Sequence, residues 1–424
     1  MREDLLHYLW KHRSFDQVEL KTTCGRSIQI LKPGFHNHNA GPDFLEAQIR
    51  IDAVAWFGSV ELHIKSSDWY QHKHDSNSNY DNVILHVVWE EDRKVFHRDG
   101  QLIPCLEIRD LTDTTLLYKY KELTCQISDI PCQFSIQSVP SIIQQSMLEN
   151  VAVERLKAKA KEVLKTFNSL NQDWEETSYR LIMRAFGTKV NKVPMLRLAE
   201  LMPFRLLKKY LNEPDTCAAL LFGQAGLLLR SKHAYVESLN KRFQYLKHKH
   251  SLKTSLDRPQ WKFSRMRPAN FPSLRLAQYS AFITQNPFLY GYLIELSAFS
   301  EIERLFKVST HTYWEDHYDF NKVRNQKSKP IVGKQMVEHL VINVFSPLLT
   351  AVSVHFDQST YMDRALQLLK NTPSESNTIT RKLKKVGIET DNALTSQGAL
   401  ALYYNYCLKK NCLQCNIGGR ILRQ

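Results

Sequence analysis

The spacing of apolar residues changes once along this 424-residue chain, near Pro140. Before that point, runs such as 44–52 and 58–65 show the two-residue alternation of β-strands. After it, apolar residues recur every three or four positions, as they do in amphipathic helices. The change predicts a mixed α/β domain over residues 1–133, with a helix beside its sheet, and a large all-α region over residues 134–424.

Three further patterns refine this prediction. Residues 82–91 are apolar almost without interruption, which is typical of a central strand covered on both faces of a sheet. Residues 95–108 read as a final hairpin pair. Residues 253–273 and 372–395 lack helical periodicity and are expected to be loop-like.

The overall composition excludes several classes of protein. With 43% apolar and 24% charged residues, the chain resembles a globular protein rather than a disordered or coiled-coil one. No run reaches the ~18 uninterrupted apolar residues of a membrane helix. The first residues, MREDLLHYLWKHR, are unlike a secretion signal. We therefore expect a cytoplasmic protein without a membrane partner, whose eight cysteines are reduced.

Charge is distributed unevenly along the chain. Residues 1–133 hold 15 basic and 20 acidic residues, a formal charge of −5, whereas residues 134–424 hold 42 and 23, a charge of +19. Such a basic region suits a polyanion, and we expect it to bind nucleic acid. The alternative is a basic surface with no polyanionic partner. The sequence does not indicate an oligomeric state.

Carboxylates and basic groups gather in GPDF (41–44) and VELHIK (60–65). Asp43 begins one predicted strand, and Glu61, His63 and Lys65 share one face of the next because side chains alternate along a strand. A hairpin would bring Asp43 near that face. Two carboxylates meeting there would suit Mg²⁺ or Mn²⁺, with Lys65 or His63 positioning a water molecule.

This arrangement resembles the PD-(D/E)XK superfamily of metal-dependent nucleases. The superfamily motif has an Asp at a strand start and Glu-x-Lys on the next strand. Asp43 and Glu61 match its first two elements, while His63 stands at the position of the lysine and Lys65 follows two residues later. The resemblance implies a restriction-endonuclease-like fold and metal-dependent phosphodiester cleavage, with Asp43 and Glu61 as metal ligands.

Over most of its length the chain also resembles the bacterial domain-of-unknown-function family 2851. That resemblance implies no particular activity. It rests on several long segments, which are NAGPDFLEAQIRID, GSVELHIKSSDWYQHKHD, YDNVILHVVWE, ALLFGQAGLL, WKFSRMRPANFPSLRLAQ and the cysteine-containing tail.

A second cluster of metal-ligating residue types lies in SSDWYQHKHD. Its Asp68, His72, His74 and Asp75 offer nitrogen and oxygen ligands within eight residues. With Glu61 and His63 nearby, they suit Zn²⁺ or Mn²⁺. The alternative is a solvated loop whose polar side chains cap a short helix. His86 lies inside the apolar strand, and we interpret it as a hydrogen-bonded core histidine.

Two features lie in the helical region. Cys407, Cys412 and Cys415 follow a C-x4-C-x2-C spacing, which suits Zn²⁺ or an iron–sulfur cluster if Cys125, Cys132 or a histidine adds a fourth ligand. The preferred interpretation is three reduced thiols packed against a terminal helix. The other feature mixes basic and aromatic residues, as single-strand binders do, or else forms a packed loop. Its residues are Lys262, Arg265, Arg267 and Arg275 with Trp261, Phe263 and Phe271.

These features favour one function and leave two alternatives. The preferred function is metal-dependent phosphodiester hydrolysis on a nucleic acid, DNA or RNA. One alternative is a non-catalytic nucleic-acid-binding or adaptor protein with a degenerate nuclease fold, which His63 in place of lysine favours. The other is a His/Asp/Glu metalloenzyme acting on a different substrate. Phosphate-binding and dinucleotide-binding glycine motifs are absent, and so are G-x-S-x-G and HExxH.

Overall fold

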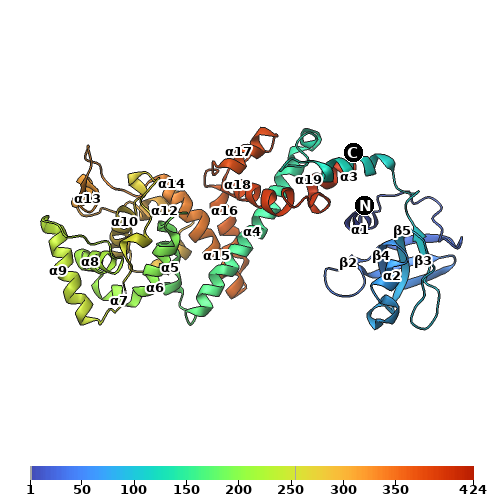
Figure 1. Ribbon diagram of the computed structural model, residues 1–424, viewed down its shortest axis with the longest axis horizontal. Coiled ribbons are helices and arrows are strands. Elements are labelled where there is room, and N and C mark those ends of the chain that lie inside the picture. The colour runs from blue at the N-terminus through green and yellow to red at the C-terminus, as the bar shows by residue number, and fades with distance from the viewer. Residues whose placement is uncertain (1, 254) are drawn as a thin grey trace. The chain divides into compact units, whose positions relative to one another are not determined.

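The computed structural model describes residues 2–253 and 255–424, which fold into two compact units (Figure 1). The first unit runs up to Met147 and also includes Leu402–Gln424, and the second is Leu148–Ala401. A mixed sheet in the N-terminal part and helices after it confirm the predicted fold class. The division differs from the predicted boundary at residue 133 because the C-terminal segment packs with the first unit. Local periodicity does not report such a long-range contact.

A single mixed sheet forms the centre of the first unit. Its order is β1-β3-β4-β5-β6, with β2 pairing with β3. The predicted hairpin is formed by β3 and β4, while β4, β5 and β6 run parallel. Neighbours on both sides explain the apolar run of β5, whose Leu85 and Val87 are fully buried. The strands are β1 (Ile28–Lys32), β2 (Phe35–His36), β3 (Phe44–Ile51), β4 (Val54–Lys65), β5 (Val83–Glu90) and β6 (Cys105–Glu107).

The hairpin predicted over residues 95–108 is wrong in its second half. Phe96 and Leu102 form only an isolated antiparallel bridge. The chain then continues to β6, which pairs in parallel with β5 through His86 and Cys105. The free edge of β5 offers three backbone pairings to β6, whereas the local hairpin forms only one bridge. Pairing with a distant strand therefore overrides the hairpin that the local sequence pattern favours.

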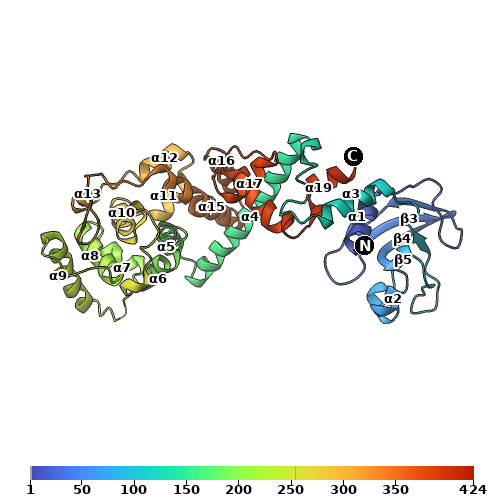
Figure 2. The same ribbon diagram turned by 45° about the horizontal axis from the view of Figure 1, so that its top comes forward.

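Apart from the start of α4 at Ser141, the α-helices described in the first unit are α1 (Glu3–His12), α2 (Asp68–Gln71), α3 (Thr114–Cys125) and α19 (Asn416–Leu422) (Figure 2). Helix α1 buries Leu5, Leu6 and Leu9 and contacts β4. The hydroxyl of Tyr8 donates to the carbonyl of Gly419, which ties the first helix of the chain to the last. The unit is therefore closed by residues from both ends of the sequence.

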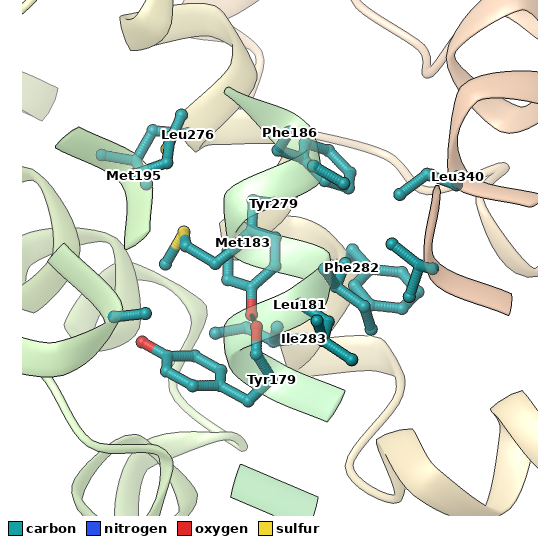
Figure 3. Packing of buried hydrophobic residues seen from close by; sticks show 14 of the residues in the cluster. Tyr179, Leu181, Met183, Phe186, Met195, Leu276, Tyr279, Phe282, Ile283 and Leu340 are labelled. Carbon is teal, nitrogen blue, oxygen red and sulfur yellow. Dashed lines mark hydrogen bonds between the residues drawn. The ribbon is translucent and has the colours of Figure 1, made fainter. Parts of the chain in front are cut away.

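The second unit is almost entirely helical, and its core is dense in aromatic rings (Figure 3). The Tyr279 hydroxyl donates to the carbonyl of Tyr179, and the Tyr179 hydroxyl donates to the carbonyl of Met202, so these buried polar groups are satisfied. Its helices are α4 (Ser141–Ser169, which begins in the first unit), α5 (Trp174–Phe186), α6 (Lys192–Leu201), α7 (Phe204–Leu207), α8 (Pro214–Gln224), α9 (Ala234–Lys249), α10 (Pro272–Gln285), α11 (Leu289–Glu295), α12 (Phe299–Leu305), α13 (Tyr313–Asp316), α14 (Lys334–Leu340), α15 (Ser346–Phe356), α16 (Ser359–Lys370), α17 (Thr378–Lys385) and α18 (Ala393–Ala401), with a small hairpin of β7 (His317–Asp319) and β8 (Lys322–Val323).

One segment of this unit differs from expectation, and a second has the length and hydropathy of a membrane span. The loop expected over 372–395 contains α17, which begins where the Asn377 side chain accepts from the amides of Ile379 and Thr380. The run Lys334–Phe356 is long and apolar enough to cross a membrane, with a mean hydropathy of 1.5. In the described residues it is the single such run, and 72% of its most apolar stretch is buried within the fold, so it is weak evidence for a membrane span.

Candidate metal centre

Three histidines from β4 and the segment after it point at one another. His63 lies on β4, His72 follows α2, and His74 begins a short 3₁₀ turn. One ring nitrogen from each lies within 4.8 Å of the other two, and Nε2 of His63 is 3.0 Å from Nδ1 of His72. Within the described part of the chain this is the one such group of histidine, cysteine and acidic residues. Three converging imidazoles are a typical transition-metal site.

Glu61 adds an oxygen atom to this group. It lies two residues before His63, so both side chains project from the same face of β4. Its Oε1 is 3.3 Å from Nε2 of His74 and 3.7 Å from Nε2 of His63. The side chains of Glu61 and His63 are only 6% and 2% exposed, whereas His72 is exposed. The cluster is therefore mostly desolvated but can be reached by solvent from the His72 side.

Asp43 lies next to Glu61 but is turned toward protein donors. Its backbone amide donates to Oε2 of Glu61 at 3.0 Å, and its own Oδ2 accepts from the amide of Leu62 at 3.1 Å. The same oxygen is 3.1 Å from Nε2 of His7 on α1. The structure thus brings Asp43 and Glu61 together at the start of the β3–β4 hairpin, as the sequence predicts, and adds His7, which sequence reasoning missed.

The electrostatics of the cluster favour a bound cation. Burial, followed by the charge of Asp43, raises the pKa of Glu61 to about 8. Burial, followed by the neighbouring imidazoles, lowers the pKa of His63 to about 2, and burial also lowers the pKa of His74. Neutral imidazoles offer free lone pairs, and two close carboxylates gain from a positive charge between them. The residues present therefore fit a divalent metal ion.

The surrounding side chains hold the histidines in place. Nε2 of His86 on β5 is 2.8 Å from Nδ1 of His63, which turns the other ring nitrogen of His63 toward His72. Tyr80 stacks on His74 with ring centroids 3.8 Å apart, and Trp69 meets the same ring edge-on. His86 is fully buried and hydrogen-bonded, as predicted, but its partner is a member of the cluster rather than the hydrophobic core.

Two residues predicted for the site lie at its edge. Asp68 uses Oδ2 to accept from the backbone amide of Lys65 at the end of β4. The side chain of Lys65 is exposed and, among the described residues, makes no hydrogen bond or ion pair with Asp43 or Glu61. The sequence held one signal for His7, which lies four residues after Glu3 and therefore on the same face of the first helix. The charges of both His7 and Asp43 act on Glu3 in the structure.

The predicted nucleic-acid segment is divided between surface and core. Lys262, Arg265 and Arg267 are exposed. Arg275 is buried, and its guanidinium donates to the side-chain oxygens of Gln278 and Asn270. Trp261 is also buried and donates from its ring to the carbonyl of Ala225. The three exposed residues are the ones available to a partner.

The three tail cysteines lie in the first unit. Cys407, Cys412 and Cys415 are buried and carry free thiols. They belong to the segment that packs near α1 and α3 rather than to the helical unit that precedes them in sequence.

Comparison with known proteins gives a family but no activity. The family model described as "Protein of unknown function (DUF2851)" matches residues 3–378. No curated protein and no solved structure matches the chain. The matched range includes every residue of the histidine cluster and ends before the tail cysteines.

Proposed function

Because this chain belongs to the DUF2851 family, whose function is unknown, we propose its activity from the chemistry of its own residues. The proposed function is metal-dependent hydrolysis of phosphodiester bonds in a nucleic acid. The observation that carries it is the convergence of His63, His72 and His74 within 4.8 Å beside a buried Glu61. Such a set of imidazole nitrogens and one carboxylate is a common ligand set for hydrolytic metal ions.

The donor set favours Mn²⁺ or Zn²⁺ over Mg²⁺, because imidazole suits transition metals and Mg²⁺ prefers oxygen ligands. His63, His72, His74 and Glu61 would hold the ion. When bound, it would supply an activated water molecule and polarise a phosphoryl oxygen. Asp43 and His7 lie beside Glu61 and form a pair that could accept a proton from an attacking water molecule.

Two observations support a nucleic-acid substrate. In the order α1-β1-β2-β3-β4-α2-β5, the β3–β4 hairpin is followed by a helix and by a strand parallel to β4, which agrees with the proposed resemblance to PD-(D/E)XK nucleases. The region after residue 133 carries a formal charge of +19, and its exposed Lys262, Arg265 and Arg267 suit phosphate contacts. We place the protein in the cytoplasm, where its eight free thiols would stay reduced.

A non-catalytic nucleic-acid-binding protein is the second candidate. It is favoured by His63, which occupies the position of the motif lysine and contacts other histidines through both ring nitrogens. In that case the cluster would hold a metal ion for structure, and the basic region would bind nucleic acid without cleavage.

The test uses the purified full-length chain with single-stranded and double-stranded DNA and RNA, each with Mn²⁺, Zn²⁺ or Mg²⁺. We expect cleavage with Mn²⁺ or Zn²⁺ and its loss in the variants Glu61→Gln and His74→Ala. The matched control is Glu46→Gln, an exposed carboxylate on β3. Cleavage that persists in both site variants would overturn the proposal. Salt-dependent binding without turnover on any of these substrates would select the second candidate.

A further inference from the structure

The helical unit contains a pocket of about 500 Å³ whose charged lining is almost entirely basic. Side chains from α4, the end of α5, the turn between α5 and α6, and the junction of α14 with α15 line it. Small-molecule sites typically occupy about 300–1,000 Å³, so the pocket has the size of such a site. Its basic residues are Arg155, Lys159, Arg184, Lys189, Lys192 and His339, and the acidic residue described among them is Glu162.

Helix periodicity turns these groups toward one space. Arg155, Lys159 and Glu162 follow one another at four and three residues on α4, so they share one face of that helix. Leu181 and Arg184 are three residues apart on α5 and share a face in the same way. Leu181 also belongs to the buried core drawn in Figure 3. The pocket therefore has an apolar base of Val163, Leu181, Ala185 and Pro347, which are buried, and a basic rim of Arg184, Lys189 and Lys192, which are exposed.

Arg155 and Lys159 are held at the pocket by neutral oxygen atoms. The ammonium of Lys159 donates to the side-chain oxygens of Asn343 and Gln397, at 3.1 and 2.8 Å. Nε of Arg155 donates to the same oxygen of Gln397 at 2.9 Å, and the amide of Gln397 donates to the Glu375 carboxylate. Among the described residues, neither cation forms an ion pair, and the two terminal nitrogens of Arg155 make no hydrogen bond. These nitrogens are available to a ligand.

A π-helical turn at the junction of α14 with α15 forms part of the pocket wall. This turn is Val341–Phe345, and it includes Asn343. Pro347 stands five residues after Ile342 and has no amide hydrogen to donate to the Ile342 carbonyl. The ammonium of Lys159 donates to that carbonyl at 3.2 Å. Single π-helical turns within helices occur frequently at functional sites, which distinguishes this wall from ordinary helix packing.

The protein around the pocket supplies little negative charge. Burial, followed by the charge of Arg155, lowers the pKa of Lys159 to about 7. Burial, followed by the charge of Lys159, lowers the pKa of His339 to about 4. The basic residues of the rim likewise form no ion pair within the described part of the chain. Because buried charges in proteins are normally paired, an anion in the pocket would be stabilised by these groups.

From this arrangement we infer that the pocket binds a small organic phosphate with at least two negative charges, such as a nucleoside diphosphate. The guanidinium of Arg155 and the ammonium of Lys189 would donate to phosphate oxygens, since charge-assisted hydrogen bonds of this kind are strong. Lys159 would add its positive charge, and the apolar base would contact the uncharged part of the ligand. The pocket shares no residue with the histidine cluster, so the inference is independent of the proposed hydrolase activity.

The lining favours a small ligand over a nucleic-acid strand. Proteins that bind single strands combine a long basic groove with aromatic rings on which the bases stack. Here the basic groups converge on one pocket, and its described lining contains no Phe, Tyr or Trp side chain. The exposed residues that we propose for nucleic-acid contacts, Lys262, Arg265 and Arg267, are not part of the pocket.

The experiment is isothermal titration calorimetry of the full-length chain with ADP, AMP and adenosine. EDTA is present so that no divalent ion links a phosphate to the histidine cluster. We expect ADP to bind more tightly than AMP, and uncharged adenosine not to bind. Arg155→Gln and Lys189→Gln should each weaken ADP binding by about tenfold or more, as the loss of a hydrogen bond to a charged group does. Lys161→Gln is the matched control, because it removes the same charge from an exposed position on another face of α4.

Each outcome supports or overturns the inference. A wild-type chain that does not bind ADP would overturn it. Equal losses of ADP affinity in Lys161→Gln and the two pocket variants would assign binding to the overall charge of the region instead. If Arg155→Gln fails to fold, Lys189→Gln carries the comparison, since Lys189 is exposed. A single-stranded oligonucleotide that binds the wild-type chain and is lost in both pocket variants, without any binding of ADP, would assign the pocket to a nucleic-acid strand and contradict the inference.

Discussion

The backbone amide of Asp43 donates to Oε2 of Glu61, and the amide that follows Glu61 donates to Oδ2 of Asp43. The two carboxylates are thus held side by side by a reciprocal pair of backbone hydrogen bonds. A register shift between β3 and β4, from Phe44 to Ala47, lies directly after Asp43. Bulges of this kind re-aim side chains, and here one accompanies the placement of a polar residue next to a buried glutamate.

Removal of the Asp43 carboxylate should lower the stability of the first unit. Asp43→Ala would leave the buried Leu62 amide without its acceptor, at a cost of about 1–3 kcal/mol. Asp43→Asn keeps an acceptor oxygen and should cost less. Urea denaturation followed by tryptophan fluorescence would measure the difference, and equal losses in the two variants would contradict this account of the hydrogen bond.

Loss of an imidazole that we propose as a metal ligand should weaken metal binding. We expect His72→Ala and His74→Ala each to reduce the affinity for Zn²⁺ or Mn²⁺ by more than about tenfold. His97→Ala is the control, since His97 lies in the same unit outside the cluster. Isothermal titration calorimetry would provide the affinities. Equal affinities for His97→Ala and the two cluster variants would show that the histidines do not bind the ion.

Replacement of His86 should affect metal affinity without removing a ligand. His86→Leu would release Nδ1 of His63 and let that ring rotate, which typically costs about 10–100-fold in affinity. His86→Gln can restore a hydrogen bond to His63 and should recover part of the loss. The two affinities, measured on chains with matching circular dichroism, would test this positioning role. Equal losses in both variants would assign the effect to packing instead.

The sequence predicted which residues form the histidine cluster better than it predicted which other residues contact them. Strand alternation placed Glu61 and His63 on one face, and the short spacing of His72 and His74 suggested a common site. What brings these two segments together is the turn after β4, where Asp68 and the packing of Trp69 and Tyr80 decide the path of the chain. His7 joins the cluster through its contact with Asp43, which lies far from it in the sequence, and local patterns do not encode such a contact. The sequence placed Lys65 correctly on β4. In the structure Lys65 is the last residue of that strand, and it is exposed.

Gly223 should be intolerant of even a small side chain. A Cβ atom there would lie 2.1 Å from Cγ of Phe243, where α8 packs against α9. Gly223→Ala should therefore destabilise the helical unit by about 1–3 kcal/mol through overpacking. Gly333→Ala is the control, because no atom lies within 4 Å of its Cβ position. Thermal unfolding followed by circular dichroism would compare the two, and a fully stable Gly223→Ala chain would disprove the close packing.

Lys159 should make stability depend on pH above neutrality. Its ammonium donates to the carbonyl of Ile342 and to the side chains of Asn343 and Gln397. Burial, followed by Arg155, lowers its pKa from 10.5 to about 7. At pH values between about 7 and 10.5, Lys159 is protonated in the unfolded chain but has lost its proton in the folded chain. The free energy of unfolding therefore rises with pH in this range, by up to about 1.4 kcal/mol per pH unit.

The test measures how much the free energy of unfolding changes between roughly pH 7 and pH 9.5, which lie between the folded and unfolded pKa values of Lys159. Lys159→Met should show a smaller rise than the wild-type chain. Lys157→Met, at an exposed position on the same helix, should behave as the wild type does. A rise that is the same in all three chains would exclude Lys159 as its source.

The return of residues 402–424 to the first unit has a consequence for biosynthesis. A ribosome releases the chain from its N-terminal side onward, so the sheet emerges long before the segment whose Gly419 carbonyl accepts a hydrogen bond from Tyr8. The helical unit is complete in sequence before the N-terminal unit can be closed. In a nascent chain, α1 and α3 therefore lack their contacts with the 402–424 segment while the helical unit is being translated. A premature stop near the end would damage the part of the molecule that was made first.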